Sequence, residues 1–255
     1  MQLADACLER DGFTWVPELL DQSSRTKLRR LTAPILEAAK RWESQGEPLW
    51  FLQDDLPELA NLLQQPSLLA RLQATCGLGQ APVKLLAATL YRKRTGEPGT
   101  AWHQDARFIP SDQLAAFTVW LPLQAIDAAN APIQFLPGSH RHCLLEQPQQ
   151  ASSPPLGLPE ASPCVATPMA FGDATIHTPW TLHGSCSNRT AAPRLALIVN
   201  YLSGPLTLNA ESALNGSHHP EIVNVLRRTN QHTLGRRLQQ PGASFSPAQW
   251  RHGQP

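Results

Sequence analysis

The sequence predicts a mainly β fold, a sandwich or barrel with helices packed on its outside. From Val83 onward, short runs rich in apolar and β-branched residues are separated by Gly/Pro turns such as Gly96-Glu97-Pro98-Gly99. The chain contains 24 prolines, which favour turns and strand edges over long helices. Helical periodicity is confined to about the first 80 residues.

Two helices are expected in this N-terminal flank. Apolar residues recur at steps of three and four over residues 28–42, which marks one face of a helix that begins after Asp21. Pro34 lies within this stretch and should kink or split the helix. A second, shorter helix is expected over residues 68–75, because a proline precedes it and Gly77 can end it.

Five strands are expected after the flank, each bounded by turn residues. They are Leu85 to Arg92, Phe117 to Ile126, Ile133 to Pro137, Ala174 to Thr178 and Leu195 to Leu202. Residues 146–163 form a polar, proline-rich insertion between strands. We expect one domain over residues 1–205, with its helical flank over residues 1–80. Residues 206–255 form a C-terminal extension that packs on the same domain.

Composition and charge exclude several classes of function. The 21 basic and 20 acidic side chains nearly cancel, whereas a nucleic-acid-binding protein normally has a basic excess. No apolar run approaches the ~18 residues that a membrane-spanning helix needs. The N-terminal residues lack the basic start and apolar core of a signal peptide, and the five cysteines are scattered. We therefore expect a cytoplasmic monomer or homodimer with reduced thiols and a small-molecule partner.

Candidate metal ligands occur in two distant segments. In the first, WHQD at residues 102–105, His103 and Asp105 would point to the same face of a strand and could supply two ligands. The second segment contains two histidines, His177 and His183, either of which could complete a set of two histidines and one carboxylate. Such a set, with open coordination positions, is typical of non-haem Fe(II) oxygenases.

Arg194 lies 11 residues after His183 and directly precedes the apolar run of residues 195–199. An arginine that enters a buried strand needs an anionic partner. The sequence leaves two candidates for this partner. One is an acidic side chain in a structural ion pair, and the other is the carboxylate of a ligand held by two guanidinium N–H groups.

Taken together, these motifs resemble the phytanoyl-CoA dioxygenase-like family of Fe(II)/2-oxoglutarate oxygenases. The resemblance covers about residues 6–205, and the motifs occur in the family's order and spacing. The matching stretches are LERDGF at 8–13, WHQD at 102–105, Val119-Trp120, LPGSH at 136–140, Gly172-Asp173, and HGS at 183–185 followed by Arg194.

The resemblance implies a double-stranded β-helix core, which is a jelly-roll of the cupin-like type. It also implies that His103, Asp105 and His183 are the ligands of the iron. Arg194, together with Ser185, would then hold the far carboxylate of the cosubstrate 2-oxoglutarate.

Further site residues follow from the same resemblance. Those expected to line the cosubstrate pocket are Trp120, Tyr91 and Lys93. Apart from the resemblance, Arg107 is a candidate substrate contact because it lies two residues beyond Asp105, and Gln104 and Trp180 are further candidates. His177 is then expected to be a packed imidazole or to lie behind the metal ligands.

The implied activity is hydroxylation of a small polar metabolite or natural-product intermediate by O₂, with release of succinate and CO₂. Asp105 favours this outcome, because related halogenases carry Ala or Gly at the corresponding position. Three alternatives remain. One is desaturation or demethylation with the same cofactors, another is a Zn-dependent hydrolase with the same three ligands, and the third is a non-catalytic jelly-roll that binds a small ligand.

One stretch departs from the family pattern. Where the family usually has an Asn-Gly turn before the LPGSH segment, this chain has Asn130-Ala131-Pro132. Because alanine resists a positive φ, we expect a different backbone geometry in this turn.

Overall fold

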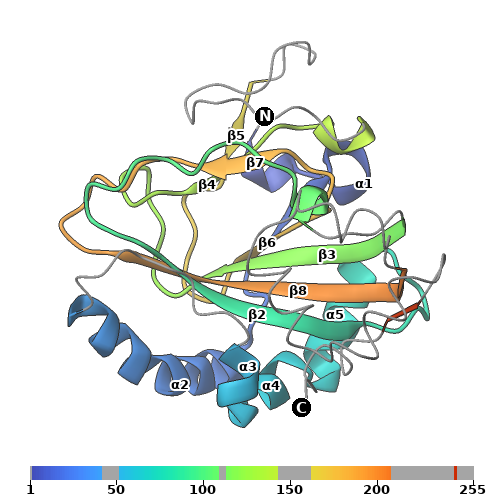
Figure 1. The fold of residues 1–255 in the computed structure, drawn as a ribbon, viewed down its shortest axis with the longest axis horizontal. Coiled ribbons are helices and arrows are strands. Elements are labelled where there is room, and N and C mark those ends of the chain that lie inside the picture. The colour runs from blue at the N-terminus through green and yellow to red at the C-terminus, as the bar shows by residue number, and fades with distance from the viewer. Residues whose placement is uncertain (1, 42–51, 109–112, 143–161, 208–243, 246–255) are drawn as a thin grey trace, which may run out of the picture.

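The computed structural model describes residues 2–41, 52–108, 113–142, 162–207 and 244–245. These residues form two antiparallel β sheets that face one another, with a layer of helices on the outer side of the larger sheet (Figure 1). This arrangement is the jelly-roll with flanking helices that the sequence predicts. Within the described residues, no helix is long and apolar enough to cross a bilayer.

The larger sheet has the strand order β1-β6-β3-β8-β2, with β9 paired to β8. Its strands are β1 (Phe13–Val16), β6 (Ala174–His177), β3 (Gln113–Pro122), β8 (Arg194–Thr207), β2 (Lys84–Lys93) and β9 (Ser244–Phe245). The smaller sheet has the order β5-β4-β7. Its strands are β5 (Cys164–Val165), β4 (Ile133–Phe135) and β7 (His183–Ser185). The five strands expected from the sequence are β2, β3, β4, β6 and β8.

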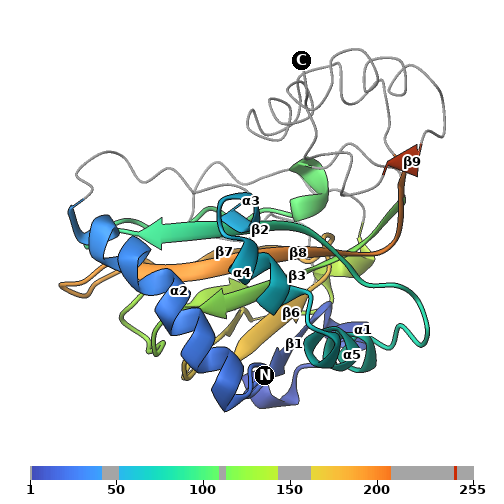
Figure 2. The ribbon, with the colours of Figure 1, turned by 90° about the horizontal axis from the view of Figure 1, so that it is seen from below.

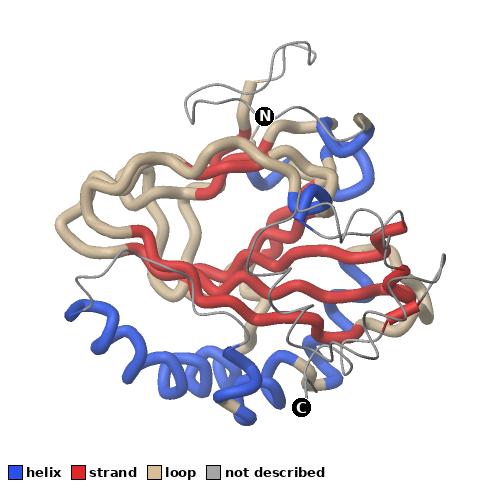
Figure 3. The backbone as a smooth tube through the Cα atoms, in the orientation of Figure 1, coloured by secondary structure: helices blue, strands red, loops and turns tan. Residues whose placement is uncertain are grey.

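Helices of the N-terminal flank cover the outer face of the larger sheet (Figures 2 and 3). They are α2 (Gln22–Arg41), α3 (Leu52–Asp55), α4 (Pro57–Leu63) and α5 (Pro66–Thr75). Shorter helices are η1 (Leu3–Asp5), α1 (Leu8–Asp11), η2 (Asp105–Phe108) and η3 (Ser139–Arg141). The two expected helices are α2 and α5, whereas α3 and α4 are too short to show a clear periodicity.

Pro34 does not split α2, contrary to the sequence expectation. A proline inside a helix removes the hydrogen bond to the carbonyl four residues earlier, which here belongs to Arg30. Both Pro34 and Arg30 are exposed. The released carbonyl can therefore bind water, and the helix continues to Arg41.

The larger sheet is covered on both faces. Because side chains alternate along a strand, one set packs against the helices and the other faces the smaller sheet. The outer set includes Ala88, Leu90, Phe117, Val119, Leu121, Leu197, Val199 and Tyr201, which pack with Leu28, Leu59, Leu62 and Leu72. Between the sheets, Phe13 stacks on Phe135 with ring centroids 4.4 Å apart. Burial on both faces explains the low content of charged residues.

The turn at Ala131 corrects the sequence expectation. Ala131 has a φ of +59° and is 0% exposed, so alanine adopts the left-handed conformation that it was expected to avoid. This conformation costs about 1–2 kcal/mol. Neighbouring contacts offset the cost, because the Asn130 side chain donates to the carbonyl of Ala125 (2.8 Å) and Asn130 forms a bridge with Asn188.

Several sequence expectations fall outside the described residues. The structure does not describe residues 146–161 of the proline-rich insertion at 146–163. It also does not describe Trp42, at the end of the first expected helix. Of the extension over residues 206–255, only residues 206–207 and 244–245 are described. The four cysteines that the structure describes, Cys7, Cys76, Cys164 and Cys186, are free thiols.

A buried glutamine protects one edge of the larger sheet. β2 is an edge strand, and the outward N–H groups of such a strand have no neighbouring strand to bind. The side chain of Gln53, from α3, supplies an acceptor, because its Oε1 receives the Ala88 N–H at 2.8 Å. Gln53 is itself buried, so water cannot replace it.

We expect Gln53→Leu to lower the free energy of unfolding by about 1–3 kcal/mol, because the Ala88 N–H would stay buried without an acceptor. Denaturant titration followed by circular dichroism measures the change. Gln80→Leu, at an exposed position, is the control and should shift stability by no more than about 0.5 kcal/mol. Equal effects of the two substitutions would show that this hydrogen bond does not stabilise the edge.

Candidate metal centre

Two reciprocal backbone hydrogen bonds place His103 and His183 side by side. The His103 N–H donates to the His183 carbonyl (2.8 Å), and the His183 N–H donates to the His103 carbonyl (2.9 Å). The two imidazole centroids are 4.2 Å apart. His183 begins β7, whereas His103 lies in an isolated bridge outside the named strands. Residues far apart in the sequence thus present their imidazoles to one point.

Asp105 completes the cluster from a turn. It is the first residue of η2, so the expectation that His103 and Asp105 lie on one strand is wrong. The chain turns here because the N–H of Ala106 binds the carbonyl of Pro179 (2.9 Å). Asp105 Oδ1 is nevertheless 3.7 Å from His103 Nε2 and 3.6 Å from the Nε2 of His183. One ligand atom of each residue lies within 4.8 Å of the others, which is close enough for one metal ion.

Backbone carbonyls set the tautomer of both imidazoles. His103 Nδ1 lies 2.8 Å from the carbonyl of Ala101, and His183 Nδ1 lies 2.9 Å from that of Thr181. A carbonyl can only accept, so each Nδ1 carries the proton and donates it. Each Nε2 is therefore unprotonated and carries its lone pair, which is the form that a metal ion requires.

Protonation states at the cluster also suit a metal. Burial lowers the pKa of His103 to about 4, with a further contribution from His183. Burial likewise lowers the pKa of His183 to about 4, with a contribution from His177. Burial alone would raise the pKa of Asp105, but the histidines, led by His183, hold it well below its usual range. Near neutral pH the cluster is therefore two neutral imidazoles and a carboxylate.

His177 lies beside this cluster. It is the last residue of β6 and is 1% exposed. Its Nε2 is 3.5 Å from Asp105 Oδ2, and its ring centroid is 4.4 Å from that of His183. Neither of its ring nitrogens has a hydrogen-bond partner among the described residues. No backbone carbonyl fixes its tautomer, in contrast to His103 and His183.

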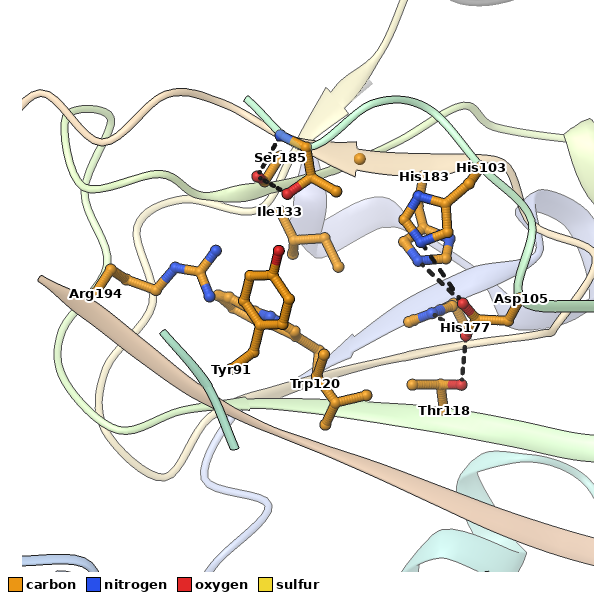
Figure 4. A pocket seen from close by; sticks show the side chains of 13 residues that line it. Tyr91, His103, Asp105, Thr118, Trp120, Ile133, His177, His183, Ser185 and Arg194 are labelled. Carbon is orange, nitrogen blue, oxygen red and sulfur yellow. Dashed lines mark hydrogen bonds and ion pairs between the residues drawn. The ribbon is translucent and has the colours of Figure 1, made fainter. Parts of the chain in front are cut away.

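A cavity of about 120 Å³ extends from the cluster to Arg194 (Figure 4). Four residues that the sequence assigned to the cosubstrate line it, namely Tyr91, Trp120, Ser185 and Arg194. The remaining lining residues are Thr100, Thr118, Ile133, His177, Gly184 and Ile198, with the three of the cluster. The cavity therefore has metal-binding groups at one end and a cation at the other.

Arg194 is a buried cation at the far end of this cavity. It is 2% exposed, and its guanidinium carbon lies 5.3 Å from the Trp120 ring centroid. Its Nε and Nη1 have no hydrogen-bond partner among the described residues, and no ion pair to a described carboxylate is found. Burial lowers its pKa to about 10. Of the two partners that the sequence left open, a ligand carboxylate fits this environment.

Ser185 and Lys93 meet at Thr100. Ser185 Oγ donates to Thr100 Oγ1 (2.9 Å) and accepts the Thr100 N–H (3.1 Å). Lys93 Nζ donates to the same Thr100 hydroxyl (2.9 Å). Burial lowers the pKa of Lys93 to about 8. Lys93 thus reaches the cavity through Thr100, whereas Ser185 lines the cavity itself.

Of the three expected substrate contacts, Gln104 and Trp180 do not line this cavity, and the side chain of Arg107 is not described. Gln104 is buried, and its side-chain amide donates to the carbonyl of Trp180 (2.7 Å). Neither residue lines the cavity formed by the described part of the chain. The backbone of Arg107 belongs to η2, but its side chain lies outside the described residues.

Sequence reasoning missed Thr118 and Thr100. The hydroxyl of Thr118 donates to Asp105 Oδ2 (2.9 Å). Strand alternation could have found Thr118, because it lies two residues before Trp120 and must share its face. Thr100 lies in an irregular segment, so no sequence period indicates where its side chain points.

Comparisons with known proteins agree with this geometry. The sequence model of the family "Phytanoyl-CoA dioxygenase (PhyH)" matches residues 8–196. The 2-oxoglutarate-dependent epimerase SnoN of nogalamycin biosynthesis is 21% identical with a TM-score of 0.69, over 96% of this chain and 91% of that chain. EvdO2 from Micromonospora carbonacea var. aurantiaca, complexed with 2-oxoglutarate, is 21% identical with a TM-score of 0.61, over 77% and 88%. EctD from S. alaskensis is 17% identical with a TM-score of 0.62, over 79% and 76%. No curated protein matches the sequence.

We expect the metal-free protein to bind Fe(II) under exclusion of oxygen, and its melting temperature to rise with metal concentration. His183→Gln should abolish this shift, because it removes a ligand. His177→Gln, a substitution at the other buried histidine of the same segment, should retain a measurable shift. Differential scanning fluorimetry in an anaerobic chamber makes the comparison. Complete loss with His177→Gln and full retention with His183→Gln would reverse the assignment of the ligands.

Proposed function

The chain belongs to the phytanoyl-CoA dioxygenase (PhyH) family, and we propose that it is an Fe(II)- and 2-oxoglutarate-dependent oxygenase that hydroxylates a small polar metabolite or natural-product intermediate. In this proposal His103, Asp105 and His183 hold the iron. Arg194 holds the far carboxylate of 2-oxoglutarate, and Ser185 assists it.

The buried guanidinium of Arg194 is the observation that carries the proposal, because its Nε and Nη1 have no hydrogen-bond partner among the described residues. An isolated buried charge is strongly unfavourable unless a counter-charge and hydrogen bonds compensate it. A ligand carboxylate would supply both, because a guanidinium can donate two parallel N–H bonds to it. A Zn-dependent hydrolase with the same triad would use a metal-bound water and has no need of this arginine.

The two ends of the cavity fit 2-oxoglutarate as one molecule. Two neutral imidazoles and a carboxylate suit a ferrous ion and leave its other coordination positions open. A 2-oxo acid can chelate a metal at such positions through its keto and carboxylate oxygens. Its second carboxylate would then extend along the cavity toward Arg194. The fit therefore involves both the donor set and the distant cation.

Iron, 2-oxoglutarate and O₂, when bound, supply the oxidising chemistry, and succinate and CO₂ are released. The protein orients these partners. Arg194 fixes one end of the cosubstrate, and the walls formed by Trp120, Ile133 and Ile198 exclude water along its length. The neutral Nε2 atoms of His103 and His183 keep their lone pairs for the metal.

Related folds carry different oxidative outcomes. Structures similar to this chain include an α-ketoglutarate-dependent carbocyclase, an epimerase, and an enzyme bound to 5-hydroxyectoine. Hydroxylation is our proposal for this chain. Desaturation or demethylation with the same cofactors is the alternative, and identification of the product distinguishes them.

The proposal extends to the setting of the enzyme. We propose that the enzyme acts as a cytoplasmic monomer or homodimer on a small-molecule substrate. The near balance of basic and acidic residues supports a small-molecule partner over nucleic acid or a membrane surface. We also propose that residues 206–255 belong to the same domain as residues 1–205. The pairing of β9 with β8 supports this assignment.

A screen of small polar metabolites with Fe(II), ascorbate and 2-oxoglutarate tests the proposed reaction. At least one compound should stimulate succinate release, and mass spectrometry should show that the product has gained one oxygen atom. Loss of two hydrogens or of a methyl group would indicate the alternative outcomes. Hydrolytic activity supported by Zn(II), without succinate, would contradict the proposal.

Arg194→Ala should raise the KM for 2-oxoglutarate at least about 30-fold, because loss of one partner of a buried charge pair costs about 2–5 kcal/mol. Steady-state succinate formation at varied 2-oxoglutarate measures the change. Arg189→Ala, at an exposed arginine of the same segment, should leave KM unchanged. An unaltered KM in Arg194→Ala would remove Arg194 from the cosubstrate site.

A further inference from the structure

Three polar side chains cross the larger sheet in one row next to Asp105. They are His177 on β6, Thr118 on β3 and Asn200 on β8, and we call them the polar row. Thr118 pairs in register with His177 on one side and with Asn200 on the other. Residues paired directly across neighbouring strands project to the same face. The whole polar row therefore points toward the space between the two sheets.

In the polar row, each hydrogen bond is donated toward Asp105, from Asn200 to Thr118 and from Thr118 to the carboxylate. The side-chain amide of Asn200 donates to Thr118 Oγ1 (2.9 Å), and Thr118 Oγ1 donates to Asp105 Oδ2 (2.9 Å; Figure 4). An NH₂ group can only donate, so the Thr118 oxygen accepts from Asn200. The single hydroxyl proton of Thr118 is left for Asp105.

The two oxygens of Asp105 consequently have different surroundings. Oδ1 faces the metal cluster, at 3.7 Å from His103 Nε2 and 3.6 Å from His183 Nε2. Oδ2 faces the polar row, where it accepts from Thr118 and lies 3.5 Å from His177 Nε2. One oxygen is thus directed inward to the metal and the other outward to the sheet.

We propose that Thr118, oriented by Asn200, is a positioning residue that holds the outer oxygen of Asp105, so that the carboxylate offers a metal only Oδ1. This inference rests on the proposed function and adds to it the group that sets the coordination mode of Asp105. A carboxylate released from Thr118 can rotate and present both oxygens. It would then take a coordination position that the cosubstrate or O₂ needs.

Packing of the sheet alone does not account for the Thr118 hydroxyl. Thr89 and Thr175 are also buried in the larger sheet, and their hydroxyls have no hydrogen-bond partner among the described residues. A strand threonine can therefore be accommodated here without a hydrogen bond. The hydroxyl of Thr118, in contrast, is engaged on both sides, by a donor from β8 and by the carboxylate of Asp105.

Thr118→Val tests the inference, because valine keeps the shape and removes the hydroxyl. Anaerobic titration of the metal-free protein with Fe(II) should give a Kd about 10–100-fold weaker than that of the wild type. For 2-oxoglutarate turnover, kcat should fall while KM stays near the wild-type value, because the Arg194 end of the cavity is unchanged. Thr118→Ser keeps the hydroxyl and should restore both quantities.

Thr89→Val is the matched control. Thr89 is 3% exposed and Thr118 is 2% exposed, and both lie on strands of the larger sheet. The control removes a buried hydroxyl that does not contact Asp105, so Fe(II) affinity should remain at the wild-type value. Thermal unfolding of the metal-free variants shows whether each one folds.

A double-mutant cycle tests the role of Asn200. Asn200→Leu alone should weaken Fe(II) binding in the same direction as Thr118→Val, by a smaller factor. In the Thr118→Val background it should add no further loss, because the hydroxyl that Asn200 orients is absent. Additive losses would show that Asn200 acts independently of Thr118.

The outcomes separate this inference from the proposed function. Wild-type Fe(II) affinity in Thr118→Val, with active wild-type enzyme, would overturn the inference and leave the function intact. So would an equal loss in Thr89→Val, or a failure of Thr118→Ser to recover binding. Failure of the wild-type protein itself to bind Fe(II) would overturn the proposed function, and the inference with it.

Discussion

The pair of backbone hydrogen bonds between His103 and His183 is the contact on which the site depends. It joins the loop after β2 to the start of β7, an edge strand of the smaller sheet. Because the two residues are directly opposite in this bridge, their imidazoles must lie side by side. Carbonyls of the same two segments then hold each Nδ1, which leaves both Nε2 lone pairs directed at Asp105. The backbone of these two segments thus sets the position, the tautomer and the direction of both imidazoles.

Burial gives the polar residues between the sheets their chemical character. The larger sheet is covered on both faces, so the polar groups on its inner face are shielded from water, and a charged group there needs compensation most. Asn200 is hydrogen-bonded to Thr118, and Thr118 is hydrogen-bonded to Asp105. The Nε and Nη1 of Arg194 find no hydrogen-bond partner among the described residues. The cavity therefore has the Arg194 guanidinium at one end and the inward oxygen of Asp105 at the other. This pair of ends is complementary to a metal-bound dicarboxylic acid.

The sequence was informative where a local pattern decides the structure. Apolar and β-branched runs between Gly/Pro turns predicted β2, β3, β4, β6 and β8. Helical periodicity predicted α2, and a preceding proline with a closing glycine predicted α5. β7 (His-Gly-Ser) and α3 (Leu-Gln-Asp-Asp) are short and mostly polar, so no apolar run or helical period indicates them. The turn at Asp105 and the left-handed Ala131 depend on long-range hydrogen bonds, which a local rule cannot include. The side chains of Lys93 and Gln104 likewise point to hydrogen-bond partners, Thr100 and Trp180, that sequence alone does not identify. Strand alternation could have placed Thr118 in the site.

Loading crystals anaerobically with Fe(II) and 2-oxoglutarate tests the central claim most directly, because anomalous scattering locates the iron. The account predicts one iron bonded to the Nε2 atoms of His103 and His183 and to Asp105 Oδ1, with a carboxylate of 2-oxoglutarate on the guanidinium of Arg194. An iron bonded to His177 in place of His183 would contradict it. So would a guanidinium that is paired with a carboxylate of the protein and turned away from the cosubstrate.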